Sequence, residues 1–270
     1  MFGKAFNKNY LKYIMMILVV FNLYPSGNKL DVETDEATID FNNEEFTADG
    51  GVTFVYPNAD AEKTAKIKAY KLKKMTDKNL VLASDGVIFE QGENKVEAEE
   101  IYFNLDNQNL KVRNGISYVK VDGAPELNNK IYYGGEEFLA QFPDEAHVKN
   151  AWFTTSKEAL KLKTFEDKPE DVLAYHLKAK KISIYPGKKL VANNVFVYAG
   201  KIPILWLPWY ASSLKSDSTA PLFPIIGSDG TNGTYILWGL DYGYNSNYFN
   251  GSAALKLTSK KGLYIGQWDN

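Results

Sequence analysis

The 270-residue chain has no cysteine and only two histidines. Without cysteine it cannot form disulfide bonds, thiolate nucleophiles or any zinc site with cysteine ligands. An excess of one charge is also lacking, because 31 lysines and arginines nearly balance 33 aspartates and glutamates. A nucleic-acid-binding protein needs a clustered basic face, so nucleic acid is not an expected partner. Stability has to come from packing, and neither a metal nor a cofactor is indicated.

Aromatic residues are abundant, in contrast: 18 tyrosines, 15 phenylalanines and 5 tryptophans make up 14% of the chain. This surplus is typical of β-rich proteins and of proteins at a membrane interface. The length allows one large all-β domain or two smaller ones, and either can bury a substantial core.

The first residues differ in composition from the rest of the chain. Lys4, Lys8 and Lys12 precede the apolar stretch YIMMILVVFNL, from Tyr13 to Leu23. A membrane-spanning helix needs roughly 20 apolar residues, so this stretch fits the apolar region of a secretory signal peptide better. No small-residue cleavage signature follows it. Residues 1–29 are therefore predicted to be a signal peptide or an uncleaved N-terminal anchor, with a buried N-terminal helix as the further alternative.

Three later segments resemble one another. They are IKAYKLKKMTDKNLVLASDGVIF (67–89), VEAEEIYFNLDNQNLKVRNGISYV (96–119) and LKAKKISIYPGKKLVANNVFVY (177–198), and a shorter copy begins at Ala37. Apolar and polar residues alternate within each copy, which is typical of antiparallel strands with one buried face. TDKN, LDNQN and YPGKK are turn sequences between these strands. The repeat predicts stacked β units that bury a common face, and residues 120–170 are expected to interrupt it.

Small residues recur at matching places of the copies. Small residues leave space in an interior unless the sheets lie close together. Two alternatives follow: the sheets pack tightly against each other, or the space between them is a trough that holds lipid. The residues predicted to line such a trough are Ile67, Ala69, Leu82, Ala98, Phe103, Val112, Ala179, Ile182, Ala192 and Val195. Ile116 and Tyr118 are expected on the same inward face.

The most apolar tract of the chain, IPILWLPWY, carries Pro203 and Pro208, and Pro221 and Pro224 follow it. Proline cannot donate a hydrogen bond to a strand ladder, so this density predicts poorly paired strand edges or a linker. A linker in water would be polar, so this one is expected to lie against lipid or another protein. Residues 201–232 are predicted to be an apolar junction.

The last part of the chain, 233–270, alternates aromatic and aliphatic residues with glycine, asparagine and serine. Three strands are expected there, and their pattern is similar to that of outer-membrane β-hairpins. Three strands cannot close a barrel, so the chain is expected to be the N-terminal portion of a longer protein.

Three segments carry a resemblance to a known family. NAWFTTS (150–156), YHLKAKKISIYPGKKLVANNVFVYAGKIPILWLPWYASSL (175–214) and APLFPIIGSDGTNGTYILWGLDYGYNSNYFNGSAAL (220–255) resemble segments of the lipopolysaccharide-assembly outer-membrane proteins of the LptD (OstA) family. The resemblance covers residues from about Ala37 onward and is strongest over the last hundred. Periplasmic bridge proteins of the same transport system share the repeat.

The resemblance implies an all-β protein: a twisted antiparallel β-jellyroll over 30–200, located in the periplasm, followed by the first strands of an incomplete outer-membrane β-barrel. It further implies that the jellyroll receives lipopolysaccharide acyl chains and that the barrel opens sideways to release them into the outer membrane. Implied partners are the periplasmic jellyroll bridge protein and the plug lipoprotein of the barrel. The implied lateral gate comprises Pro203, Trp206, Pro208, Pro221 and Pro224. Ser156 stands where known members carry cysteine, so disulfide-controlled assembly is excluded for this segment.

Other function classes have less support in the sequence. An enzyme is not expected, because His147 and His176 are isolated and the DEAH sequence at 144–147 has no phosphate-binding loop beside it. His176 is expected at the surface. Paired acids such as Glu99 with Glu100 are expected on solvated faces, whereas a glycosidase would need two carboxylates facing each other. The remaining alternatives are a periplasmic bridge-type lipid-binding protein and an exported β-helix adhesin or structural protein.

Overall fold

The chain is all-β, and two very short helices occur in the part of it that the structure describes. The computed structural model describes residues 11–14, 19–21, 30–34, 36–40, 45–60, 63–75, 77–121, 130–162, 167–214, 225–242 and 251–267. The strands are β1 (Leu11–Ile14), β2 (Val19–Phe21), β3 (Leu30–Glu33), β4 (Glu36–Asp40), β5 (Glu45–Tyr56), β6 (Ala65–Met75), β7 (Leu80–Gln91), β8 (Asn94–Asn104), β9 (Leu110–Lys120), β10 (Lys130–Gln141), β11 (Glu145–Thr154), β12 (Tyr175–Tyr185), β13 (Lys189–Ala199), β14 (Ile202–Ser213), β15 (Ile225–Asp229), β16 (Gly233–Tyr242), β17 (Gly251–Thr258) and β18 (Gly262–Gln267). The 3-10 helix η3 (Lys157–Lys161) and the helix α1 (Pro169–Val172) lie between β11 and β12.

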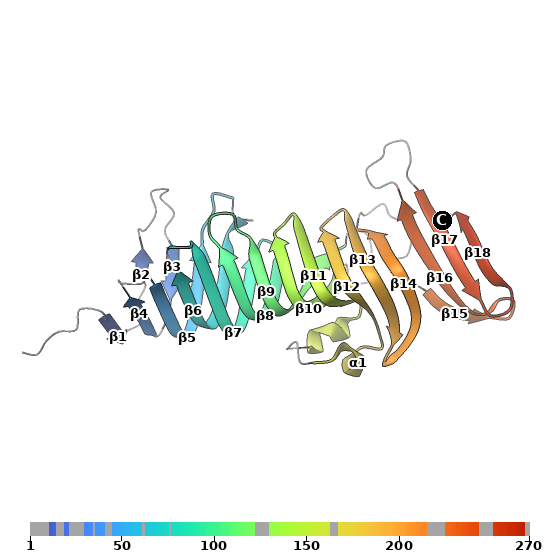
Figure 1. Cartoon of the computed structure of the whole chain (residues 1–270), viewed down its shortest axis with the longest axis horizontal. Helices are drawn as coiled ribbons and strands as arrows, with labels where there is room; N and C mark the ends of the chain where they lie inside the picture. The colour runs from blue at the N-terminus through green and yellow to red at the C-terminus, as the bar shows by residue number, and fades with distance from the viewer. Residues whose placement is uncertain are drawn as a thin grey trace, which may run out of the picture.

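Among the described residues the strands form two antiparallel sheets. The large sheet runs β1-β4-β5 and then in chain order from β6 to β14, while β3 also pairs with β5 and β2 with β3. The small sheet runs β15-β16-β17-β18. The large sheet makes the molecule long, and the small sheet lies at its C-terminal end (Figure 1). Consecutive pairing of this kind needs only short connections, such as the turns at 77–79, 105–109 and 186–188, which lie within turn sequences predicted above.

Each long strand bends near its middle. In β8, Val96 is buried and Ala98 partly so, and the buried positions then shift by one residue to Ile101 and Phe103. The same shift occurs in β6 and in every strand from β9 to β14. Because strand side chains alternate with a period of two, this shift keeps one set of side chains inside although the strand changes direction.

The residues at the bend adopt an unusual backbone conformation on every second strand. Asp85, Asn114, Asn150 and Asn194 have φ between 46° and 64°, and Gly50 and Gly51 stand at the same place in β5. Asparagine, aspartate and glycine tolerate this left-handed region best. Side chains from neighbouring strands bind all four of the asparagines and aspartates: Glu99 accepts from Asn114 (2.6 Å), Glu136 accepts from Asn150 (2.6 Å), Lys71 pairs with Asp85 (3.2 Å), and Trp206 donates to Asn194 (2.8 Å).

The bends fold the large sheet onto itself. Phe89 pairs with Val96 and Phe103 with Val81, so the two phenylalanines are separated by eight residues along β7. In a flat sheet that distance is about 26 Å, yet their rings are 5.6 Å apart. The bend divides the large sheet into two parts. The first half-sheet contains residues 87–91 of β7 and the parts of other strands that pair with them. The second half-sheet contains residues 80–84 of β7 and the parts of other strands that pair with them.

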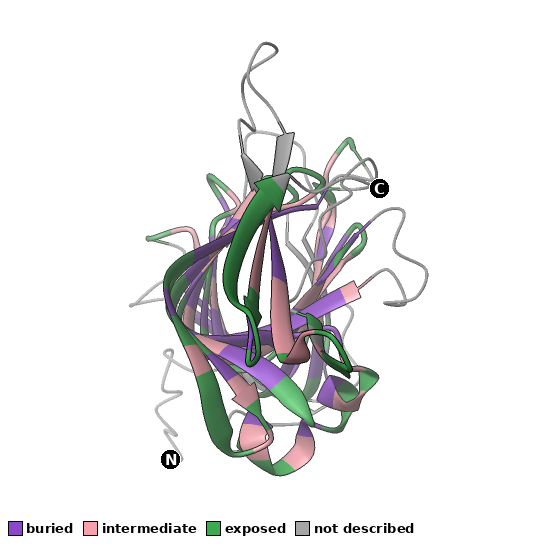
Figure 2. Ribbon diagram, turned by 90° about the vertical axis from the view of Figure 1, so that its right-hand side faces the viewer, coloured by how far each residue is buried: buried purple, intermediate pink, exposed green. Residues whose placement is uncertain are grey.

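The core lies between the two half-sheets. Viewed along the long axis, the strands curve around a common interior with buried segments toward the middle of the molecule (Figure 2). Residues next to the bend are mostly small, such as Ala48, Ala83 and Ala192, whereas Phe54 and Phe89 occupy positions one step further away. The half-sheets are nearest to each other at the bend, which explains why small residues recur there.

Residues 120–170 continue the repeat instead of interrupting it. Two further bent strands, β10 and β11, lie there, and η3 and α1 follow. With Leu162 and Leu173 these helices form an outer cap that covers Tyr132 and Trp152. Ile116 and Tyr118 pack on this outer cluster, so their predicted inward orientation is wrong. Gly115, Ser117 and Val119 occupy the inward positions of β9 instead.

The junction expected at 201–232 is also different in the structure. Its first part is β14, which pairs with β13 over its whole length and completes the large sheet. Its last part is β15, which belongs to the small sheet. Pro203 lies beside a register shift at Val197/Tyr198 and Pro208 lies at the bend, and β14 has no further neighbour among the described residues. Edge strands and irregular positions are where sheets tolerate proline.

Of the predicted leader, residues 11–14 and 19–21 are described, as β1 and β2. No helix in the described part of the chain has the length and apolar character needed to cross a membrane. The strands expected within 233–270 appear as β16, β17 and β18.

Candidate lipid-binding interior

The structure brings the predicted lining residues together in one core, with one exception. Ile67, Ala69, Phe103, Val112, Ala179, Ile182, Ala192 and Val195 are buried, and Ala98 packs against them while partly exposed. Leu82 lies on the opposite face of β7, because its neighbours Val81 and Ala83 point inward. The buried residues Val81, Ala83, Val87 and Phe89 keep one alternation through the bend of β7, and Leu82 falls between them, so the sequence prediction was out of phase by one residue.

The interior is filled rather than thin. Phe54, Phe89, Phe103, Phe138 and Phe153 are each 0% exposed, which leaves no room for a water-sized probe beside them. Rings contact each other along the core, for example Tyr133 and Phe138 with centroids 5.6 Å apart. The expectation of a sparsely filled trough is therefore wrong for this conformation. An acyl chain needs the half-sheets to separate before it enters.

The half-sheets meet again on the side opposite the bend, which we call the mouth. Two hydrogen bonds cross it near β7 and β8. The Tyr56 hydroxyl donates to the Leu105 carbonyl (3.0 Å), and the Gln91 amide donates to the Gln108 side-chain oxygen (3.1 Å). Gln91 also donates to the Lys63 carbonyl (2.9 Å) and is buried. The mouth is thus held by polar contacts, which exchange with water more readily than an apolar core separates.

A cleft of about 260 Å³ lies along the same mouth. Glu93, Tyr118 and Val119 of the first half-sheet line it on one side, and Pro143 and Pro186 from turns of the second half-sheet line it on the other. Lys130 places its ammonium 3.8 Å from the centre of the Tyr118 ring. Lys120 forms an ion pair with Glu93 at the same rim. Apolar side chains and charged side chains therefore line this part of the mouth together.

The apolar interior continues onto the small sheet. Tyr210 of β14 stacks on Trp238 of β16, with centroids 5.8 Å apart and planes at 11°. Trp238 belongs to the buried core, Leu255 packs against it, and Leu255 pairs with Ile265 of β18. Along the same face, Leu257 is 47% exposed, Leu263 56% and Ile265 74%. One apolar surface thus runs from the closed interior to the outside of the molecule.

Three of the five predicted gate residues are described in the structure, and they lie on β14, the strand that contacts the small sheet. Pro203, Trp206 and Pro208 are exposed on β14, and the Trp206 indole donates to the Asn194 side chain at the bend (2.8 Å). Pro221 and Pro224 lie outside the described residues. The described gate residues therefore face outward, whereas Tyr210 makes the contact with the small sheet.

His176 is buried, contrary to its expected place at the surface. It is 0% exposed, stacks on Tyr198 with centroids 4.9 Å apart, and neither ring nitrogen has a hydrogen-bond partner among the described residues. Its pKa is lowered to about 4, mainly by burial and to a smaller extent by Lys178, while Glu170 opposes the shift. Glu170 belongs to α1, which packs beside the start of β12, and forms an ion pair with Lys178 (2.8 Å). The cap explains the burial, which the strand pattern alone does not reveal.

Sequence reasoning missed the residues that close the mouth, Tyr56, Gln91 and Gln108, since a polar residue at a strand end is ordinarily exposed. No group of three or more His, Asp or Glu side chains suited to a metal ion occurs in the part of the chain that the structure describes. Comparison with protein-family models gives no match, and comparison with curated protein sequences gives none either.

Proposed function

We propose that this protein binds the acyl chains of lipopolysaccharide between its half-sheets and passes them to the outer membrane. The folded large sheet corresponds in this proposal to a periplasmic OstA-like jellyroll, reached through a signal peptide, and the small sheet to the first strands of an outer-membrane β-barrel. The proposed partners are the periplasmic jellyroll bridge protein and the plug lipoprotein. No catalytic role is proposed.

The observation that carries the proposal is the apolar surface that leaves the interior. A protein whose core served stability alone would cover Leu257, Leu263 and Ile265, because exposed contiguous apolar surface is costly in water. Here these side chains extend the core through Trp238 and Leu255. A lipid leaving the half-sheets along this surface keeps its acyl chains out of water at every step.

Entry requires the mouth to open. The hydrogen bonds of Tyr56 and Gln91 each contribute about 1 kcal/mol, so breaking them costs little compared with the burial of an acyl chain, which contributes roughly 0.8 kcal/mol for each methylene group. Acyl chains then replace contacts between the phenylalanine rings of the core. The closed structure is the lipid-free state in this proposal.

The filled core favours a second candidate, an exported structural protein or adhesin whose half-sheets never separate. The two candidates differ in one measurable respect, the access of lipid to inward positions. A bridge-type periplasmic protein, the third candidate, would bind lipid in the same way but would not use the exposed face of β17 and β18.

Photo-crosslinking separates these candidates. Benzoylphenylalanine at Ala98, which points inward and is partly exposed, is compared with the same probe at Glu97, its outward neighbour in β8. Irradiation of the full chain with lipopolysaccharide is expected to give a lipid adduct at position 98 at least ten times as abundant as at 97. Equal adducts at both positions, or none at 98 in a folded protein, would refute lipid binding in the interior and favour the structural role.

A further inference from the structure

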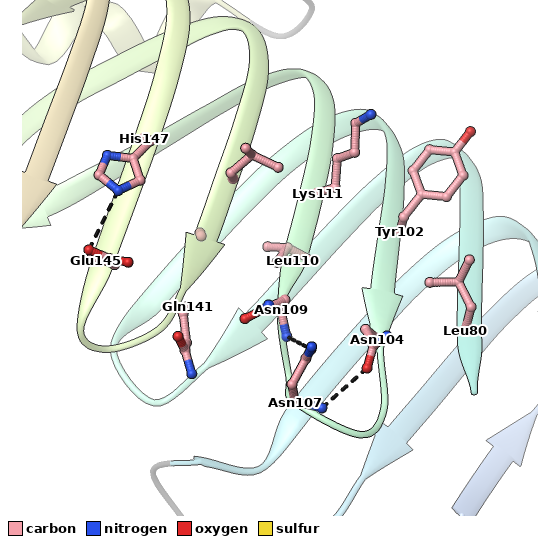
Figure 3. Close-up of a pocket in the computed structure, with 12 residues that line it drawn as sticks. Leu80, Tyr102, Asn104, Asn107, Asn109, Leu110, Lys111, Gln141, Glu145 and His147 are labelled. Atoms are coloured by element: carbon pink, nitrogen blue, oxygen red, sulfur yellow. Dashed lines mark hydrogen bonds and ion pairs between the residues drawn. The ribbon is translucent and has the colours of Figure 1, made fainter. Parts of the chain in front are cut away.

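A second concave site lies outside the folded sheet, on the outer face of the second half-sheet. It is a groove of about 660 Å³, here called the outer groove, between the β8–β9 turn and the ends of β10 and β11 (Figure 3). Its lining side chains include Tyr102, Leu139 and His147, which alternate with the inward residues of the same strands. The groove is therefore separated from the interior by the thickness of the sheet.

The floor of the outer groove combines the apolar surfaces of Tyr102, Leu139 and Leu80 with two polar side chains, Lys111 and His147. Tyr102, Lys111, Leu139 and His147 form one row across β8, β9, β10 and β11, each paired with the next. Leu139 is 45% exposed at the centre of this row, and Leu80 lies at its edge. A leucine in the middle of a charged outer face has no role in the core, since Phe138 and Ala140 supply the inward contacts of β10.

The rim carries side-chain amides. Asn104, Asn107 and Asn109 come from the β8–β9 turn, and Gln141 ends β10 (Figure 3). Within the turn, the Asn104 oxygen accepts from the Asp106 and Asn107 backbones (2.9 and 3.2 Å), and the Asn107 oxygen accepts from Asn109 (3.0 Å). These bonds orient the amide planes. The NH₂ groups of these amides make no hydrogen bond among the described residues, so Asn104 and Asn107 present oriented donors at the rim, and Asn109 and Gln141 add further donors.

Charges in the groove are balanced. Lys111 lies 3.9 Å from Glu137, and His147 lies 3.5 Å from Glu145 and hydrogen-bonds Ser183 (2.9 Å). A strongly anionic or cationic ligand therefore gains little here, and an acyl chain would leave the amides without partners. The chemistry that fits is a neutral ring with one apolar face and hydroxyl groups along its edge.

We propose that the outer groove binds an oligosaccharide. The apolar faces of the sugar rings pack on Leu139 and Tyr102, and the hydroxyls accept from the amides of Asn107 and Gln141 and donate to Glu145. The volume lies within the range of roughly 300–1,000 Å³ typical of small-molecule sites. The sugar has two sources: the glycan portion of a glycolipid, or a free polysaccharide. The site depends on neither the interior nor the mouth.

The test is calorimetric titration of the full chain with two lipid-free probes. One is the core oligosaccharide released from lipopolysaccharide by mild acid, and the other is maltohexaose. Leu139→Asp removes the apolar floor, and Leu160→Asp is the matched control, because Leu160 is an exposed leucine on η3 away from the groove. Leu139→Asp is expected to weaken binding at least tenfold with an unchanged thermal midpoint, and Leu160→Asp to leave both unchanged.

Binding of the core oligosaccharide alone assigns the groove to a glycolipid, and binding of both probes assigns it to a broader class of polysaccharide. Absence of binding for both probes at millimolar concentration, or binding that Leu139→Asp leaves unchanged, overturns the proposal. This test is independent of the test of lipid binding in the interior. Leu139→Asp changes no inward residue, so the lipid adduct at position 98 can still be measured in that variant and reports on the half-sheets alone.

Discussion

At the scale of single residues, the bends depend on asparagine and aspartate in the left-handed backbone region. Asn114 has φ 51° and its side chain donates to Glu99 across to β8. A β-branched residue in this region is strained by about 1–3 kcal/mol, whereas glycine adopts it without steric cost.

Replacing Asn114 with valine is therefore expected to lower the free energy of unfolding by about 1–3 kcal/mol, and Asn114→Gly by less than about 1 kcal/mol. Urea unfolding followed by tryptophan fluorescence measures both. Arg113→Val is the control, since Arg113 is the exposed preceding residue of β9. Equal losses for all three variants would show that the backbone at position 114 is not strained.

The residues at the bends also show what the sequence could reveal. The alternation in β8 and β9 predicted the strands and most of the buried lining residues. Asp85-Gly86 and Asn114-Gly115, however, are the pairs that normally make tight hairpins, because both uses need a positive φ. Whether such a pair turns the chain back or bends a continuing strand depends on the neighbouring strands, so the fold of the sheet onto itself could not be predicted.

At the scale of elements, the outer cap shows the same limit. Trp152, Thr154 and Ser156 of the WFTTS segment begin it: Trp152 lies in the covered cluster, Thr154 donates to the Tyr175 carbonyl (3.0 Å), and Ser156 caps η3. A short irregular segment has no periodic alternation of apolar and polar residues. Its packing over β10 and β11 therefore could not be predicted from the sequence. The burial of His176 follows from this packing.

The cap makes stability depend on pH through His176. The ordinary histidine pKa is 6.5 and the folded-state pKa is about 4, so the unfolded chain binds the proton more readily between these values. Stability conferred by neutral His176 is complete above pH 6.5 and is lost as the pH falls toward 4, by about 3 kcal/mol in all. Denaturant unfolding between pH 7 and pH 4 measures this loss.

His176→Leu is expected to reduce that pH dependence, because a side chain that cannot be protonated then packs against Tyr198 at every pH. The charged groups near it, Glu170, Lys178 and Lys201 with Asp171, are retained in the variant. His147→Gln serves as the control, since it leaves His176 in place. An unchanged pH profile in His176→Leu would assign the acid sensitivity to other groups.

At the scale of the whole molecule, the apolar interior between the half-sheets continues onto the small sheet, and polar contacts of Tyr56 and Gln91 close it at the mouth in the described part of the chain. The junction predicted from the prolines lies in the right region, but its role differs: β14 is a complete strand of the large sheet, and the passage to the small sheet runs through Tyr210 and Trp238. Contacts between distant parts of the chain set this passage, so proline density alone could not locate it.

The mouth offers the sharpest test of how the system works. The chain has no cysteine, so Gln91→Cys with Gln108→Cys introduces the only two thiols, at side chains that meet across the mouth. Without a crosslinker this variant lacks the Gln91–Gln108 hydrogen bond and is expected to give more lipid adduct at position 98 than the parent. Bridging the thiols with a short bismaleimide is expected to reduce the adduct at least tenfold, because the half-sheets can no longer separate there.

The single variant Gln108→Cys, treated with the same reagent, controls for alkylation. Undiminished adduct in the bridged protein would mean that lipid reaches Ala98 by a route other than the mouth, with the passage at Trp238 as the remaining entrance.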